Sequence, residues 1–380
     1  MYRLFLFMKI HVLYEHLQNK LSLVNKAISS RTQLPILQNM LLVGKDGQLI
    51  ISGTDLEIGI QVKIPANIET EGAITLPAKS FLELVNSLPK GKITIEMQGK
   101  NVLVTTKNTK STFQTITADD FPKLYEEKGE EIAQILPGVF QKTLSHILFA
   151  ASVDTARPAL SGIYIKKDES DGGKQFFVVA TDGYRLSLVR NEIPLRIEKP
   201  LLISARALRE MVVIKSDGKT PIKIYASEKS NQVVFEQEDV LVVGRLIEAA
   251  FPSYEKIIPQ DVVTKVFFDR EEMGKAVKMC AIFARESANI VRFSVKQGSI
   301  TVTANAPQTG DNTVEVEAKV DGDNNEIAFN VRYLLDLFAN MTDEEMILEM
   351  TTPTSPGVFK IKGDPTFLHL IMPIRVQQES

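Results

Sequence analysis

The sequence predicts an α+β protein built from three repeated modules, each with two helices packed on a largely antiparallel sheet. The first observation is a segment that occurs three times: a short apolar strand, a capping residue and an amphipathic helix. The three copies are Ile74–Val85, Leu201–Val212 and Ile327–Phe338. Their helix-start residues, Pro77, Ser204 and Asn330, are 127 and 126 residues apart. Such a nearly constant period indicates repeated structural units.

Two other landmarks repeat at nearly the same interval. Thr54-Asp55, Thr181-Asp182 and Ala304-Asn305 each end a β-like run, and they are spaced by 127 and 123 residues. Phe121-Pro122 and Phe251-Pro252 are 130 residues apart. Because independent landmarks share one period, the repeat extends over the whole chain.

We place the module boundaries in two segments that lack a β or helical period. Lys123–Glu131 is charged and contains Gly129, and Ile257–Asp261 contains Pro259. The modules then comprise residues 1–128, 129–259 and 260–380. Residues 1–7 are an extension ahead of Met8, a second candidate start.

The first module is predicted to open with a strand and a helix. The strand is Lys9–Leu13, and the helix that follows runs out at Ser29-Ser30-Arg31. Its apolar stripe has steps of three or four residues and consists of Leu13, Leu17, Leu21, Val24 and Ile28. A second helix spans Ala78–Leu88. The alternating runs predicted as strands are Leu37–Val43, Gln48–Ser52, Ile58–Ile64, Ile93–Met97, Asn101–Thr106 and Ser111–Thr117.

The later modules repeat this plan. In the second, Phe140, Leu144, Ile147 and Ala151 form the stripe of a helix. Its strands include Ile163–Lys166 and Gln175–Ala180, on either side of the turn Asp171-Gly172-Gly173. In the third, a helix from about Asp269 to Arg285 buries Met273, Val277, Cys280 and Ala284. The remaining strands are Ile290–Val295, Ser299–Asn305, Thr313–Val320, Thr342–Met350, Gly357–Lys362 and Thr366–Pro373.

The composition is that of an ordinary globular protein with few options for cofactor chemistry. The 380 residues are 44% hydrophobic and carry a net charge of −3. Cys280 is the single cysteine, which excludes an internal disulfide and agrees with a reducing cytoplasm. No apolar run approaches the roughly 20 residues that span a bilayer. The four histidines lack metal-ligand spacing, no nucleotide-binding motif is present, and Asp321–Glu326 is better explained as a turn than as a calcium loop. We expect no cofactor and no metal.

The segment around Asp182 leaves two interpretations open. Asp182, Tyr184 and Arg185 could act on a phosphate-containing substrate. Alternatively, Asp182 makes the turn between two strands, with Tyr184 and Arg185 on the surface. The second interpretation is favoured because the first module has Asp55 at the matching place.

Basic side chains lie on the polar face of every predicted helix. Each of them singly can be an ordinary solvated charge, but together they predict a basic face on an acidic body, which attracts phosphates without reading sequence. A scaffold that joins proteins through strand edges and never encircles DNA is the alternative. The basic residues are Lys20, Lys26, Arg31, Lys79, Lys142, Arg206, Arg209, Lys215, Lys275, Lys278, Arg285 and Arg332.

Several motifs, in order and at matching spacings, resemble the bacterial DNA polymerase III β subunits, the sliding clamps. The likeness runs from about Met8 to Val376. It implies a non-catalytic head-to-tail homodimer that closes a ring around double-stranded DNA and binds DNA polymerase III α, other polymerases and a clamp loader. The motifs are Thr54-Asp-Leu-Glu, Leu76-Pro-Ala-Lys, Asp120-Phe-Pro, Ala180-Thr-Asp-Gly-Tyr-Arg-Leu, Phe251-Pro-Ser-Tyr, Phe329-Asn-Val-Arg-Tyr-Leu-Leu and Met372-Pro-Ile-Arg.

The resemblance also implies a peptide pocket between the second and third modules. Its apolar floor would be Leu160, Thr181, Leu186, Pro252, Ile257, Leu370 and Met372. Its polar rim would be Arg157, Asn330, Tyr333 and Arg375. The alternative for Leu186, Ile257, Leu370 and Met372 is plain core. Arg31 and Lys79 match positions that face DNA in the family, whereas Tyr184 and Lys256 replace the His and Arg of many relatives.

Overall fold

The computed structural model describes residues 8–29, 32–154, 156–192 and 195–375. It consists of two compact units, which are described separately. Unit 1 contains the chain up to Gly138 together with Arg206–Leu246, and unit 2 contains Val139–Ala205 and the chain from Ile247 onward. The predicted second module is therefore divided between the units, because its strands continue the sheets of both neighbouring modules.

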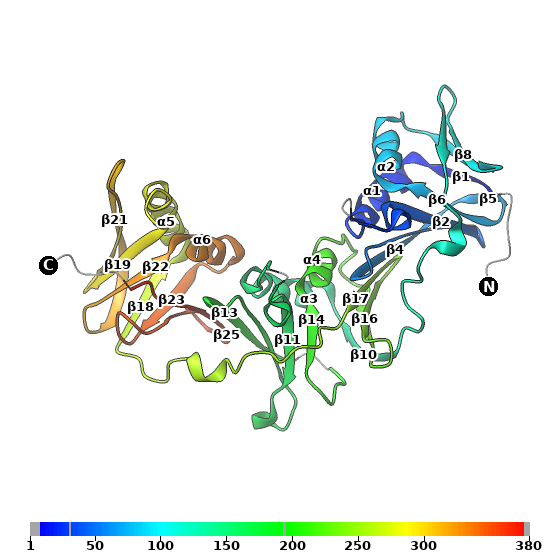
Figure 1. Cartoon of the computed structure of the whole chain (residues 1–380). Coiled ribbons are helices and arrows are strands. Elements are labelled where there is room, and N and C mark those ends of the chain that lie inside the picture. Colours follow the sequence, from blue (N-terminus) through cyan, green and yellow to red (C-terminus); the bar gives the residue numbers. More distant parts are fainter. Residues whose placement is uncertain (1–7, 30–31, 155, 193–194, 376–380) are drawn as a thin grey trace. The chain divides into compact units, whose positions relative to one another are not determined.

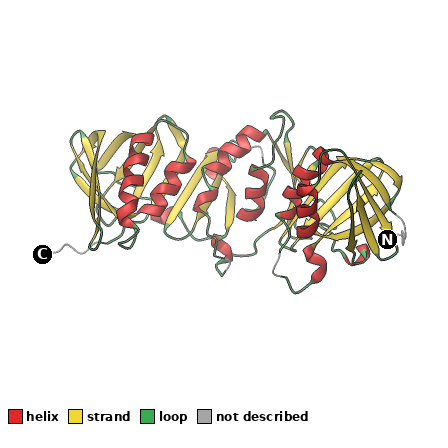
Figure 2. Ribbon diagram, turned by 90° about the horizontal axis from the view of Figure 1, so that it is seen from above, coloured by secondary structure: helices red, strands yellow, loops and turns green. Residues whose placement is uncertain are grey.

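Unit 1 begins with a five-stranded antiparallel sheet. Its order is β5-β1-β7-β8-β9, and its strands are β5 (Asn67–Thr70), β1 (Lys9–Leu13), β7 (Lys92–Gln98), β8 (Asn101–Thr105) and β9 (Lys110–Gln114). The helices α1 (Tyr14–Asn25) and α2 (Ala78–Ser87) lie side by side, as Figure 2 shows near the N-terminus. They bury the apolar residues Leu17, Leu21, Val24, Phe81 and Val85.

The second sheet of unit 1 joins strands from two predicted modules. Its order is β10-β15-β16-β17-β4-β3-β2-β6. In β4, Gly59 lies opposite Val243 of β17, so the two modules share one continuous sheet. The strands are β10 (Glu130–Ile135), β15 (Ile222–Ser227), β16 (Gln232–Gln237), β17 (Val240–Arg245), β4 (Ile58–Pro65), β3 (Gln48–Thr54), β2 (Asn39–Lys45) and β6 (Gly72–Pro77). Most of the helix α4 (Ala205–Val212) belongs to this unit.

Unit 2 contains a continuous array of twelve strands (Figure 1). In order they are β14 (Leu201–Ser204), β11 (Gly162–Lys167), β12 (Phe176–Thr181), β13 (Arg185–Asn191), β25 (Asp364–Ile371), β24 (Gly357–Ile361), β23 (Glu345–Met350), β18 (Thr264–Asp269), β21 (Gly310–Gly322), β20 (Ser299–Ala306), β19 (Ile290–Lys296) and β22 (Asn325–Asn330). The second and third predicted modules meet where Leu186 of β13 lies opposite Leu370 of β25.

The helices of unit 2 include the predicted cap at Asn330, a further cap at Asp269 and the predicted apolar stripe of α5. They are α3 (Pro137–Ser145), α5 (Arg270–Ala284) and α6 (Val331–Asn340). Asp269 Oδ1 accepts a hydrogen bond from Glu272 N at 2.8 Å, and Asn330 Oδ1 accepts one from Arg332 N at 3.0 Å. Both bonds satisfy amides of a first helical turn. The stripe of α5 is fully buried, as predicted, and consists of Met273, Val277, Cys280 and Ala284.

Four sequence-based expectations are wrong in detail. Leu13 is 47% exposed because it ends β1 and precedes α1 instead of joining the helix stripe. The helix α1 ends at Asn25, before Ser29. The helix α3 ends at Ser145, so Ile147 and Ala151 are buried outside it. The strand β10 was not expected, because its start lies within a charged segment.

No described helix is long and apolar enough to cross a bilayer.

Candidate functional site

The site is organised by a tight turn between β12 and β13. Thr181 Oγ1 donates to Arg185 O at 2.6 Å, and Asp182 Oδ1 accepts from Tyr184 N and Arg185 N at 2.9 and 3.0 Å. Gly183 has a φ of +93°, a conformation that glycine adopts without strain. The Asp182 carboxylate is therefore used to build the backbone turn, which leaves Tyr184 58% exposed at its tip.

Unit 1 contains the same turn, as the repeat predicts. Thr54 Oγ1 donates to Ile58 O at 2.8 Å, and Asp55 Oδ1 accepts from Glu57 N and Ile58 N at 3.1 and 3.0 Å. The interpretation of Asp182 as a residue of the repeated fold is confirmed. The third landmark differs, because Ala304-Asn305 lies inside β20, which continues to Ala306.

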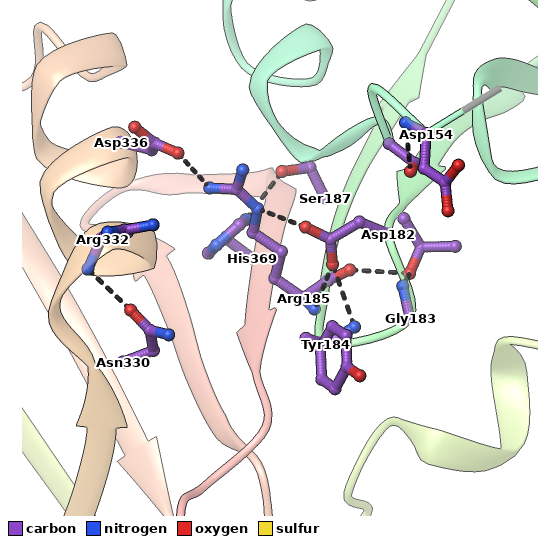
Figure 3. Close-up of polar contacts among 12 residues, drawn as sticks. Asp154, Asp182, Gly183, Tyr184, Arg185, Ser187, Asn330, Arg332, Asp336 and His369 are labelled. Atoms are coloured by element: carbon purple, nitrogen blue, oxygen red, sulfur yellow. Dashed lines mark hydrogen bonds and ion pairs between the residues drawn. The ribbon is translucent and has the colours of Figure 1, made fainter. Parts of the chain in front are cut away.

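Arg185 is buried, which contradicts the expectation that it lies on the surface. Its Nε donates to Asp182 Oδ2 at 3.0 Å, and its Nη1 donates to Asp336 Oδ2 on α6 at 2.6 Å (Figure 3). The guanidinium carbon also lies 4.7 Å from the centroid of the Tyr333 ring and 5.7 Å from that of Phe149. Successive residues of a strand point to opposite faces, so the side chains of Arg185 and Leu186 lie on opposite faces of β13.

Leu186 and Leu370 form a fully buried base on the other face. They pair across β13 and β25 and join a core cluster with Val179, Tyr254 and Val358. Their side chains have no exposed area, so a partner cannot contact them directly, and they instead pack beneath the surface residues. Two further residues of the expected floor are also buried, namely Leu160 and Thr181.

Three apolar residues of the expected floor reach solvent instead of joining this base. Ile257 is 40% exposed and Met372 is 37% exposed, and Pro252 is exposed on the same linker as Ile257. Met372 N donates to Tyr184 O at 2.8 Å, which holds Met372 beside the turn. The Tyr184 and Tyr333 rings are stacked with centroids 6.4 Å apart. Aromatic and methionine side chains are common in surfaces that bind other proteins.

Two residues of the expected polar rim, Arg157 and Tyr333, contact the turn. Arg157 is exposed, and its Nε lies 3.3 Å from Asp154 Oδ2 while its Nη1 donates to Asp182 O at 3.5 Å. Asn330 caps α6, six residues before Asp336 (Figure 3). Arg375 is exposed, three residues after Met372.

A serine–histidine pair also lies at this junction. Sequence reasoning missed it because its members are 182 residues apart. Ser187 Oγ and His369 Nδ1 are hydrogen-bonded at 2.7 Å, and neither residue has exposed area. Burial, together with the charge of Arg185, lowers the pKa of His369 to about 3, which keeps the imidazole neutral. No substrate can reach this pair in the folded chain, so its arrangement suits packing between β13 and β25.

The predicted basic residues differ in how freely their charge is available. Four of them pair with carboxylates: Lys20 with Asp239, Lys26 with Glu210, Arg206 with Asp55, and Lys275 with Glu271. Arg209 is half-buried, which lowers its pKa, and Arg31 lies outside the described residues. The exposed lysines that form no ion pair with another described residue include Lys79, Lys142 and Lys278. Across the described parts of the chain, no group of three or more metal-binding side chains occurs.

Comparisons with known proteins agree on one family. Models of the N-terminal, central and C-terminal domains of the DNA polymerase III beta subunit match residues 8–125, 134–253 and 255–375. A beta sliding clamp from Synechococcus elongatus is 30% identical, and the match covers 97% of this chain and all of the relative.

Two solved structures are similar over nearly the whole chain. The DNA polymerase sliding clamp from Bacillus subtilis has a TM-score of 0.90 at 28% identity and covers 97% of this chain and 100% of its own. The C. crescentus beta sliding clamp has a TM-score of 0.91 at 27% identity and covers 97% and 99%.

Proposed function

The chain belongs to the DNA polymerase III beta subunit family, and we propose that it forms a ring-shaped homodimer that encircles duplex DNA and tethers polymerases to it. The family consists of sliding clamps of DNA replication, which catalyse no reaction. The three modules are residues 1–128, 129–259 and 260–380, and the protein acts in the cytoplasm, where the chromosome is copied.

The ring closes through strand edges of opposite charge. β9 is the last strand of its sheet, and residues 310–317 of β21 pair with β20 alone. Exposed Lys107 and Lys110 lie at β9, whereas β21 carries exposed Asp311, Glu315 and Glu317. Head-to-tail pairing of these edges satisfies their free backbone groups and brings opposite charges together.

Within the ring, lysines hold the DNA without reading its sequence. Lys79, Lys142 and Lys278 are the residues best suited to phosphates, because their ammonium groups are exposed and unpaired among the described residues. Bidentate base contacts would each add about 1–3 kcal/mol of site preference and would stop the ring from sliding. Contacts limited to phosphates leave it free to move.

A partner binds at the turn before β13. The observation that carries this assignment is the exposed pair Tyr184 and Met372, which lie two residues from the buried Leu186 and Leu370 and are joined by a hydrogen bond between Met372 N and Tyr184 O. Ile257 is exposed on the linker whose Tyr254 packs in the same core cluster. Such a surface suits an extended peptide with an apolar anchor, and its affinity is concentrated in a few buried contacts. DNA polymerase III α, other polymerases and the clamp loader use it in turn. Tethering raises the effective concentration of a polymerase at the primer end.

Retention on DNA of different topology tests the proposal. After loading by a clamp loader, the protein should stay on nicked circular DNA and leave quickly once the circle is cut to a linear form. Equal retention on both would exclude encirclement and favour a scaffold that binds proteins through strand edges. The native mass should be twice that of the 42.3 kDa chain.

A further inference from the structure

Each repeated turn is followed by a strand that pairs with a strand of another predicted module, so the two pairings can be compared position by position. In the first junction, β4 with β17, Ile58 lies opposite Gly244. In the second junction, β13 with β25, Arg185 lies opposite Ile371. The next backbone bonds also match: Arg245 N donates to Glu57 O at 3.1 Å, and Met372 N donates to Tyr184 O at 2.8 Å. Arg185 therefore occupies the position that a buried isoleucine, Ile58, has in the first junction.

Both turn aspartates bind a guanidinium, but it comes from different elements. Asp55 is paired with Arg206 of the helix α4. Asp182 is paired with Arg185, which belongs to the strand that follows the turn. The counterpart of Arg206 on α6 is Arg332, 126 residues later, which is exposed and forms no ion pair with another described residue. In the first junction, a helix arginine neutralises the turn carboxylate. The carboxylate of Asp182 therefore does not by itself explain why an arginine occupies position 185.

The strand position gives Arg185 contacts that Arg206 does not make. From β13 its guanidinium reaches Asp336 at 2.6 Å and lies 4.7 Å from the centroid of the Tyr333 ring. Tyr333 is stacked in turn with Tyr184, whose carbonyl binds Met372 N. One buried cation therefore connects the turn with the helix α6 (Figure 3) and contacts the aromatic pair of the proposed partner site.

We propose that Arg185 is a positioning residue of the partner-binding site, a role that rests on the proposed function. It holds Tyr333 and, through the turn, Tyr184 in one arrangement before the partner arrives. A side chain that is already ordered does not have to lose its rotamer entropy on binding. The planar guanidinium can bind two carboxylates and an aromatic face at once, which a lysine ammonium cannot do with the same geometry.

The test compares variants of Arg185 with a matched variant of the first junction. The probe is a fluorescein-labelled peptide from the cognate DNA polymerase III α subunit, and anisotropy measures its affinity for full-length Arg185→Lys, Arg185→Met and Arg206→Met. We expect both Arg185 variants to lose at least tenfold in affinity, whereas Arg206→Met stays within twofold of the unmodified chain. All three should remain dimers, and both Arg185 variants should be retained on nicked circular DNA.

If the Arg185 variants fold poorly, Asp336→Asn is the second variant. Asp336 is half exposed, so replacing its carboxylate by an amide should leave the fold intact. It should lower peptide affinity at least threefold without changing retention on DNA. Peptide affinity within twofold of the unmodified chain for folded Arg185→Lys and Asp336→Asn would overturn the role of Arg185. A failure of the unmodified chain to bind the peptide would instead contradict the proposed function itself.

Discussion

Arg185 and Asp336 are 151 residues apart in the sequence, and their side chains form an ion pair with an Nη1–Oδ2 distance of 2.6 Å. Arg185 starts β13 and Asp336 lies in α6, so the pair links the second predicted module to the third. The first junction contains the opposite arrangement, in which Arg206 of a helix reaches Asp55 of the turn. Both junctions thus contain an ion pair between an arginine and the turn aspartate. The arginine is buried in the second junction and half-buried in the first.

Replacing Arg185 should destabilise unit 2 more than replacing Arg206 destabilises unit 1. Arg185→Met removes the cation of the half-buried Asp182 and also the ion pair with Asp336 and the contact with the Tyr333 ring, which together cost about 3–5 kcal/mol. Arg206→Met also leaves a carboxylate without its cation, that of Asp55, but Arg206 is itself half-buried and stacks on no ring among the described residues, so the cost should be smaller. Urea unfolding of both variants, followed by far-UV circular dichroism, measures the difference. Equal losses would mean that the burial of Arg185 has no energetic consequence.

His369 should make the protein less stable in mild acid. Its pKa is about 3 in the folded chain, below the ordinary value of 6.5, so the unfolded chain binds the proton more readily. The stability is complete above pH 6.5 and falls with each pH unit between 6.5 and about 3. At pH 5 the loss is about 2 kcal/mol, since one pKa unit is about 1.4 kcal/mol.

The matched variant for this prediction is His369→Leu, which removes the titrating group. Urea midpoints at pH 7 and pH 5 should differ by less in this variant than in the unmodified chain. The same pH dependence in both chains would show that other groups cause the acid effect.

A side chain at Gly59 should lower stability while Leu124 is present. A Cβ at Gly59 would lie 2.8 Å from Leu124 Cδ2. Gly59→Ala is therefore expected to cost about 1–3 kcal/mol, and Leu124→Ala in the same chain should relieve part of that cost. A double-mutant cycle measures this coupling. Additive effects of the two substitutions would show that Leu124 moves away freely.

Local patterns were enough to predict the repeated turn, the cap at Asn330 and the apolar stripe of α5. The hydrogen bonds of Asp182 and the cap at Asn330 involve residues within three positions, and the apolar period of α5 is uninterrupted. Arg185 could not be placed this way, because Asp336 approaches it only after β13 and α6 have packed. Leu13 was misplaced because its spacing continues the stripe of α1 although the strand ends there. The sheet that joins two predicted modules, β17 with β4, is likewise a long-range pairing that no local period indicates.

Ile282 should be needed for ring closure. It is 63% exposed on α5, and this helix packs against β20 and β21, whose free edge we assign to the subunit interface. Ile282→Asp places a charge on an apolar contact and should shift the protein toward monomers. Analytical ultracentrifugation over a range of concentrations measures the shift. Val213→Asp, at a side chain that is 53% exposed after α4, is the control and should remain a dimer.

Met372 and Ile257 give the cleanest test of the partner site, and Leu186 does not. Leu186 is fully buried in the cluster with Tyr254, so a polar residue there would damage the core and lower peptide binding indirectly. Met372→Asp and Ile257→Asp change side chains that already reach solvent, so the fold should be kept while a charge replaces an apolar contact. We expect each to weaken binding of the polymerase peptide by at least tenfold, with an unchanged dimer mass. Anisotropy titration beside Val213→Asp measures the effect, and unchanged affinity in both variants would move the partner site away from the turn at Tyr184.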